Sequence, residues 1–88
     1  GLEILEPNDI EFVEIYTCFG KTYLKKGEFN KSFEYYKKSL EIDKKVAQDN
    51  DFTIGVTLMG MGLVFYRQNN LKSSKAYLQK AQKIFENI

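Results

Sequence analysis

The stretch YTCFGKTYLKKGEF, from Tyr16 to Phe29, carries the features that decide the fold. Its aromatic residues recur every three or four positions, as they do on one side of an α-helix, and Gly20 lies inside this helical pattern. The pattern then breaks at Gly27. A glycine within a helix costs about 1 kcal/mol relative to alanine, so Gly20 predicts a place where a neighbouring element approaches the helix closely.

The same pattern occurs twice in the chain. At an offset of 42 residues, Gly20 aligns with Gly62, and the aromatic residues around it align with large apolar residues. In each copy, a helical run is followed by a short break and a second amphipathic run. We therefore expect four helices, over about residues 10–26, 30–48, 51–68 and 71–86, that form two antiparallel hairpins. In this arrangement Gly20 and Gly62 are packing contacts between paired helices.

The spacing of these residues resembles that of the tetratricopeptide repeat family. The first copy matches the pattern of that family at Tyr16, Phe19, Gly20, Tyr23, Gly27, Phe29, Ser32, Tyr36 and Ser39. The second copy matches it more loosely, at Leu58, Met61, Gly62, Phe65, Asn69, Leu71, Ser74, Leu78 and Ala81. The resemblance implies an all-α fold in which two tandem antiparallel helical hairpins form part of a right-handed superhelix.

The repeats also define the domain. We expect a single domain over residues 1–88, with repeat one at about 10–50 and repeat two at about 51–88. Residues 1–7 resemble the end of a hairpin's second helix, because LEILEP is similar to LEIDK at 40–44 and its proline stands where such helices stop. The chain is thus expected to be a fragment of a longer array.

The repeat length departs from the usual family value. Its 42 residues exceed the common length of about 34, and the excess falls in KKVAQDND, residues 44–51. Such long repeats are similar to those of kinesin light chains and of peptide-responsive regulators in Gram-positive bacteria.

Composition argues against several classes of function. Thirteen basic and twelve acidic residues give a net charge of +1, so nucleic acid and anionic membranes are not expected partners. The chain has no histidine and one cysteine, which argues against an enzyme, a metal site or any other cofactor, and favours a cytoplasmic location. The uncharged run from Phe52 to Tyr66 is 15 residues long, shorter than the ~20 residues that span a membrane, and predicts a buried helix.

The resemblance implies that the first helix of each hairpin lines a concave groove. Helical spacing places two stripes there: Glu14, Thr17, Cys18, Lys21 and Lys25 in the first repeat, and Val56, Met59, Leu63, Tyr66 and Arg67 in the second. The apolar positions have two open interpretations, contact with a bound peptide or cover by a neighbouring repeat or another copy of the chain. Cys18 is interpreted as a small, half-buried side chain rather than a reactive thiol.

The function expected from the resemblance is that of a protein-interaction scaffold that binds a peptide or helix of a partner protein. The alternative is a peptide-sensing regulatory domain of a bacterial transcription factor or signalling protein, which only the long repeat favours. Because two hairpins leave the outer side of the fourth helix uncovered, we also expect self-association or hairpin swapping through Ile84 and Phe85.

Overall fold

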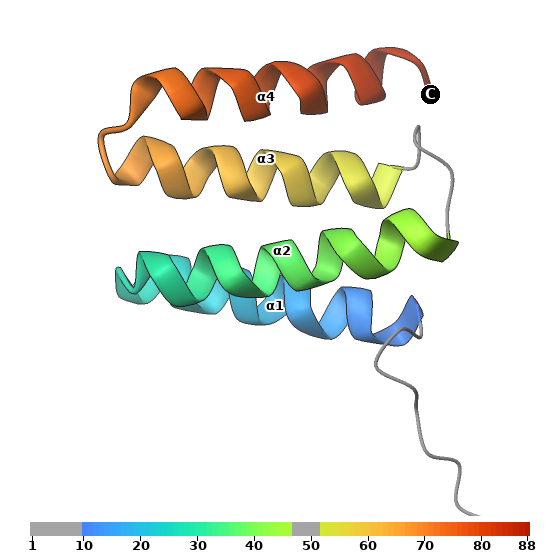
Figure 1. Cartoon of the computed structure of the whole chain (residues 1–88), viewed down its shortest axis with the longest axis horizontal. Coiled ribbons are helices and arrows are strands. Elements are labelled where there is room, and N and C mark those ends of the chain that lie inside the picture. The colour runs from blue at the N-terminus through green and yellow to red at the C-terminus, as the bar shows by residue number, and fades with distance from the viewer. Residues whose placement is uncertain (1–9, 47–51) are drawn as a thin grey trace, which may run out of the picture.

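The computed structural model describes residues 10–46 and 52–88, and it places four α-helices there without a strand. Helices α1 (Ile10–Lys26) and α2 (Phe29–Val46) form one antiparallel hairpin, and α3 (Phe52–Arg67) and α4 (Leu71–Glu86) form the other. Figure 1 shows α2, α3 and α4 side by side, with α1 behind α2. The predicted all-α fold of two helical hairpins is confirmed, whereas the interpretation of residues 1–7 concerns a segment outside the described residues.

Both hairpins turn in the same way. Helix α1 ends at Gly27, which has a φ of 79°; the backbone N–H of Gly27 donates to Leu24 O at 3.1 Å, and that of Glu28 donates to Tyr23 O at 2.9 Å. At the end of α3, Asn69 has a φ of 64° and takes the place of Gly27. These bonds are those of the Schellman motif, which satisfies the last carbonyls of a helix and requires a residue in the left-handed region.

The core is centred on Tyr36, whose side chain is 2% exposed and belongs to a cluster with buried apolar residues of α3. A β-carbon at Gly20 would lie 2.9 Å from the Tyr36 ring, so α1 can approach α2 only because residue 20 is glycine. The Ser32 hydroxyl donates to Gly20 O at 2.6 Å, which fixes the same contact. The prediction that Gly20 is a packing contact between α1 and α2 is therefore confirmed.

Glycine has the same role between α3 and α4. A β-carbon at Gly62 would lie 2.8 Å from the Leu78 side chain, and one at Gly55 would lie 2.7 Å from the Phe85 ring. The basis for the expected self-association is thus wrong, because Ile84 and Phe85 are half-buried and pack towards Gly55 of α3 instead of facing outward. Two glycines let α4 lie close to α3, and that closeness partly buries Ile84 and Phe85.

The two hairpins meet through α2 and α3. The ring of Phe33 in α2 lies 5.3 Å from that of Phe65 and 6.5 Å from that of Tyr77, both with edge-to-face geometry. Helix α1 contacts α3 to a much smaller extent. Within residues 10–46 and 52–88, no helix is both long enough and apolar enough to cross a bilayer.

Candidate functional site

The α1 stripe predicted to line the groove is mostly at the surface. Glu14, Cys18, Lys21 and Lys25 are exposed. Cys18 was expected to be half-buried, and this is wrong because helical geometry places it about 200° around α1 from Gly20, which faces α2. Carboxylate, thiol and ammonium groups thus lie along this stripe, and its two lysines can attract an acidic partner.

Thr17 does not belong to the exposed stripe. Its side chain is 9% exposed, and its hydroxyl donates to Val13 O at 2.7 Å. The same oxygen lies 2.9 Å from the Ser39 hydroxyl, which itself donates to Val13 O at 3.1 Å. The assignment of Thr17 to the groove surface is therefore wrong, because hydrogen bonding turns this side chain towards α2.

The α3 stripe is apolar and largely exposed. Met59, Leu63 and Tyr66 are 38%, 40% and 59% exposed, whereas Val56 is half-buried. Arg67 is exposed, and its guanidinium carbon lies 5.7 Å from the centroid of the Phe29 ring of α2. The stripe therefore offers three large apolar side chains, with a cation that already stacks on an aromatic ring at its end.

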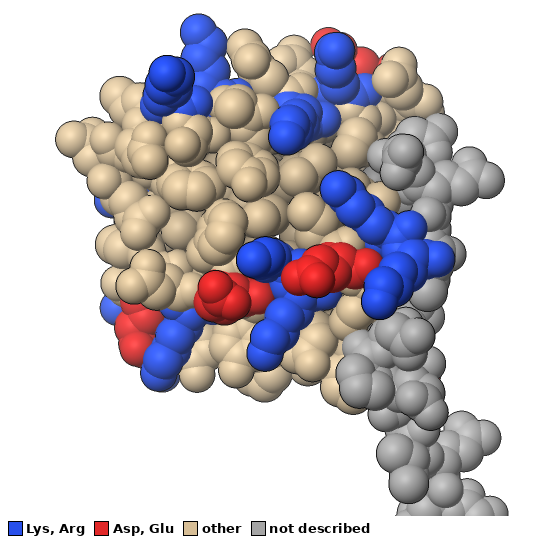
Figure 2. Space-filling view, viewed as in Figure 1, with Lys and Arg blue, Asp and Glu red and all other residues tan. Residues whose placement is uncertain are grey.

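The charges of the molecule are not spread evenly. On the face shown in Figure 2, charged side chains gather over α2 and α4, and an uncharged band runs between them along α3. Helix α1 lies behind α2 in this view and contacts α3, so the polar α1 stripe and the apolar α3 stripe are on neighbouring helices.

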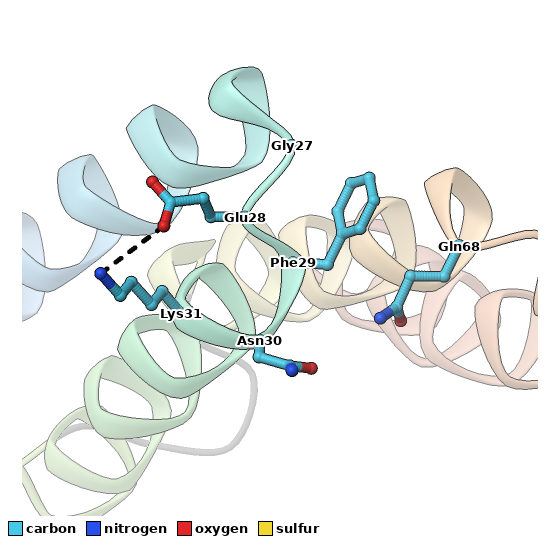
Figure 3. Close-up of a pocket in the computed structure, with 6 residues that line it drawn as sticks. All are labelled: Gly27, Glu28, Phe29, Asn30, Lys31 and Gln68. Atoms are coloured by element: carbon cyan, nitrogen blue, oxygen red, sulfur yellow. Dashed lines mark ion pairs between the residues drawn. The ribbon is translucent and has the colours of Figure 1, made fainter.

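A shallow hollow of about 410 Å³ lies where the two hairpin turns meet (Figure 3). Phe29 and Asn30 line it from the start of α2, and Gln68 lines it from the end of α3. Lys31 Nζ lies 3.5 Å from a Glu28 carboxylate oxygen in an exposed ion pair. Because both side chains of this pair are largely exposed, the pair adds little to stability.

The phenol of Tyr36 has a strongly altered environment. Burial, and to a lesser extent the neighbouring Cys18, raises the pKa of Tyr36 to about 12. The phenol is thus neutral at physiological pH and serves packing. Among the described residues there is no cluster of three or more histidine, cysteine, aspartate and glutamate side chains that could hold a metal ion.

A profile of the family described as Tetratricopeptide repeat matches residues 11–87. The chain belongs to the tetratricopeptide repeat family. No curated protein and no solved structure was found to match it. The four helices are consistent with two tetratricopeptide repeats, and membership of the family indicates a scaffold for protein–protein interaction.

Sequence reasoning missed a second exposed surface of this tetratricopeptide repeat domain. Ile15 and Phe19 are 40% and 45% exposed, although Phe19 was counted among the residues of the structural signature. Their equivalents at the offset of 42 residues, Thr57 and Met61, are 0% and 2% exposed. The offset was a signal that could have found the surface, because it pairs Ile15 and Phe19 with two positions of α3 that are buried.

Proposed function

We propose that this domain is a protein-interaction module whose groove, formed by the α1 and α3 stripes, binds a peptide or helix of a partner protein. The observation that carries the proposal is the exposure of Met59, Leu63 and Tyr66 on α3. Large apolar side chains gathered at a surface mark contact sites, and methionine and tyrosine are enriched in the cores of such sites. Because α3 lies next to the lysine-bearing helix α1, the proposed surface has an apolar part and a basic part, and a bound segment would have a preferred orientation.

The chemistry of the two stripes defines the partner segment. An apolar anchor would lie against Leu63 and Tyr66, and an acidic residue would face Lys21 and Lys25. Because the lysines are exposed, they contribute to the association rate and to specificity more than to affinity. We therefore expect binding to weaken with added salt, without disappearing.

The proposal can be tested by selecting peptides from a displayed random library on the immobilised domain. Peptides with an apolar anchor and a nearby carboxylate should be enriched, and Leu63→Asp or Tyr66→Ala should abolish their binding while the helical circular dichroism spectrum persists. Phe19→Asp, at an exposed apolar position outside both stripes, is the matched control and should leave binding unchanged. Equal affinity for the unmodified domain and for both groove variants would refute the groove assignment.

A further inference from the structure

The apolar side of α3 that faces away from α2 and α4 has the residue spacing of a helix–helix contact. Phe52 lies about one turn before Val56 and is 61% exposed. With Phe52 included, apolar side chains recur there at intervals of four and three residues, and we call them the α3 seam: Phe52, Val56, Met59, Leu63 and Tyr66. This alternation is the heptad spacing of helices that pack side by side at a small crossing angle. The α3 seam therefore suits a helix as its occupant.

The order of side chain types along the α3 seam is the same in both directions. An aromatic residue stands at each end, and these residues, Phe52 and Tyr66, are 61% and 59% exposed. The next residue from either end is aliphatic, Val56 or Leu63, and Met59 stands in the middle. When two copies of α3 pack antiparallel about Met59, each residue therefore meets one of its own type. A two-fold symmetric dimer requires such a self-complementary surface.

The charges of α1 also match in this antiparallel arrangement. Helices α1 and α3 run in the same direction and are in contact, so the α1 stripes of two face-to-face copies also meet (Figure 1). Glu14 lies towards the start of α1, whereas Lys21 and Lys25 lie towards its end. All three are exposed, and none is in an ion pair within residues 10–46 and 52–88. Antiparallel copies place the carboxylate of one copy opposite the lysines of the other, twice by symmetry.

A parallel arrangement of two copies has no such match. It would place Arg67, at the end of α3, beside its counterpart in the second copy, where the two guanidinium groups repel each other. It would also align the dipoles of the two α3 helices, which is less favourable than opposing them. The antiparallel direction thus follows from the order of both the apolar and the charged side chains.

We propose that the α3 seam binds the α3 seam of a second copy of this chain in an antiparallel, two-fold symmetric dimer. Symmetry sets the pairs that meet: Phe52 with Tyr66, Val56 with Leu63, and Met59 with itself. The contact does not involve the surface of Ile84 and Phe85, which pack towards Gly55 within the domain.

The dimer has a consequence for the groove, and this consequence rests on the proposed function, whereas the dimer itself does not. Met59, Leu63 and Tyr66 belong both to the α3 seam and to the groove. A partner segment therefore reaches them only when the two copies separate. Self-association competes with partner binding and sets the protein concentration above which the groove is covered.

The oligomeric state of the 88-residue chain tests the contact. Sedimentation equilibrium should show a dimer fraction that rises with protein concentration. Leu63→Asp places a carboxylate against Val56 of the second copy and should raise the Kd of the dimer at least about tenfold. Leu71→Asp, at a residue of α4 that is 58% exposed and outside the α3 seam, is the matched control and should leave the Kd unchanged. Circular dichroism should show that both variants remain helical.

Disulfide cross-linking tests the direction and the register. In a Cys18→Ser background, Met59→Cys places two thiols next to each other at the two-fold axis, within the Cα–Cα limit of about 7 Å, so oxidised glutathione should yield a covalent dimer. Leu63→Cys is the matched control, because residues 59 and 63 are 38% and 40% exposed. Its counterpart in the second copy lies about 12 Å away along the helix axis, so little covalent dimer should form.

Three outcomes would overturn the dimer: a monomer at all concentrations, a dimer that Leu63→Asp leaves unchanged, or equal cross-linking of both cysteine variants. A peptide selected on the immobilised domain should lower the dimer fraction when it is added. Peptide binding without that effect would overturn the competition for the groove. A monomeric chain that binds the peptide would overturn the dimer and leave the proposed function in place.

Discussion

The ring of Tyr36 lies against the backbone of Gly60, where a β-carbon would be 2.5 Å from Cζ. The same ring lies against Gly20, where a β-carbon would be 2.9 Å away. Because Gly20 belongs to α1 and Gly60 to α3, one side chain of α2 determines how closely both helices approach. The junction between the two hairpins thus depends on two glycines that face a single tyrosine.

Gly60→Ala should destabilise the domain even though alanine favours helix formation by about 1 kcal/mol. The added methyl group would overlap the Tyr36 ring, which cannot move away because Gly20 lies close to it. Overpacking of this kind costs about 1–3 kcal/mol, and we expect a net loss within that range in urea unfolding. In a Tyr36→Leu background the same change should cost less. Purely additive effects of the two substitutions would contradict the contact.

Tyr36 should also make stability depend on pH in alkaline solution. Its pKa is raised from 10.0 to about 12 by burial first and by Cys18 second. Well below pH 10 the phenol is neutral in both the folded and the unfolded chain, so it contributes no pH dependence there. Between about pH 10 and 12 the unfolded chain releases this proton and the folded chain retains it, so stability falls as the pH rises.

Tyr36→Phe removes this ionisation. Relative to its stability at pH 8, the variant should lose about 1 kcal/mol less than the unmodified domain at pH 11. Urea unfolding at both pH values measures the difference. Tyr66→Phe, at a side chain that is 59% exposed, is the control and should follow the unmodified domain. Identical pH profiles for Tyr36→Phe and the unmodified domain would show that the Tyr36 phenol ionises normally when folded.

The helices could be predicted from the sequence because each is specified locally. Gly27 marks the end of α1, and the expected bounds of α4 agree with those observed. Gly20 and Gly62 identified the close contacts because glycine is unfavourable within a helix unless another element needs the space. Helical periodicity and the internal repeat are therefore enough to predict the two helical hairpins from the sequence.

The candidate surfaces were harder to predict because exposure depends on neighbours. Thr17 and Phe19 occupy positions that the repeat pattern describes well, yet a hydrogen bond to Ser39 helps bury the first, and the second is 45% exposed. Spacing alone predicts that Phe85 faces outward, because it does not reveal the room that Gly55 leaves for the Phe85 ring. Hydropathy spacing reports which residues share a face, and it does not report which helix lies on that face.

The buried hydrogen bonds between Thr17 and Ser39 give a third prediction. Thr17→Val or Ser39→Ala alone leaves the remaining buried hydroxyl with fewer partners and should cost about 1 kcal/mol. The double variant should cost less than the sum of both, since the second repeat has Met59 and Ala81 at these positions. A double-mutant cycle in urea measures the coupling energy. A coupling energy of zero would show that the two hydroxyls act independently.

Thr57 provides a prediction of the opposite sign. Its side chain is 0% exposed, and its hydroxyl has no hydrogen-bond partner within the part of the chain that the structure describes. Thr57→Val should therefore stabilise the domain by about 1 kcal/mol, because it removes the cost of a buried, unpaired hydroxyl. Thr22→Val, at an exposed position whose hydroxyl donates to Cys18 O, is the control and should not stabilise. A lower unfolding midpoint for Thr57→Val would show that this hydroxyl is paired in solution.

At the turn of the first hairpin, the cost of backbone strain can be measured without any steric overlap. A β-carbon at Gly27 would meet nothing within 4 Å, so a substitution there is penalised only through its φ of 79°. Gly27→Ala should thus destabilise by about 1–2 kcal/mol, and Gly27→Asn by less, because asparagine tolerates the left-handed region. Asn69, with a φ of 64°, already shows this tolerance in the second repeat. Lys26→Ala serves as the neighbouring control, and equal urea midpoints for both Gly27 variants would rule out a left-handed turn.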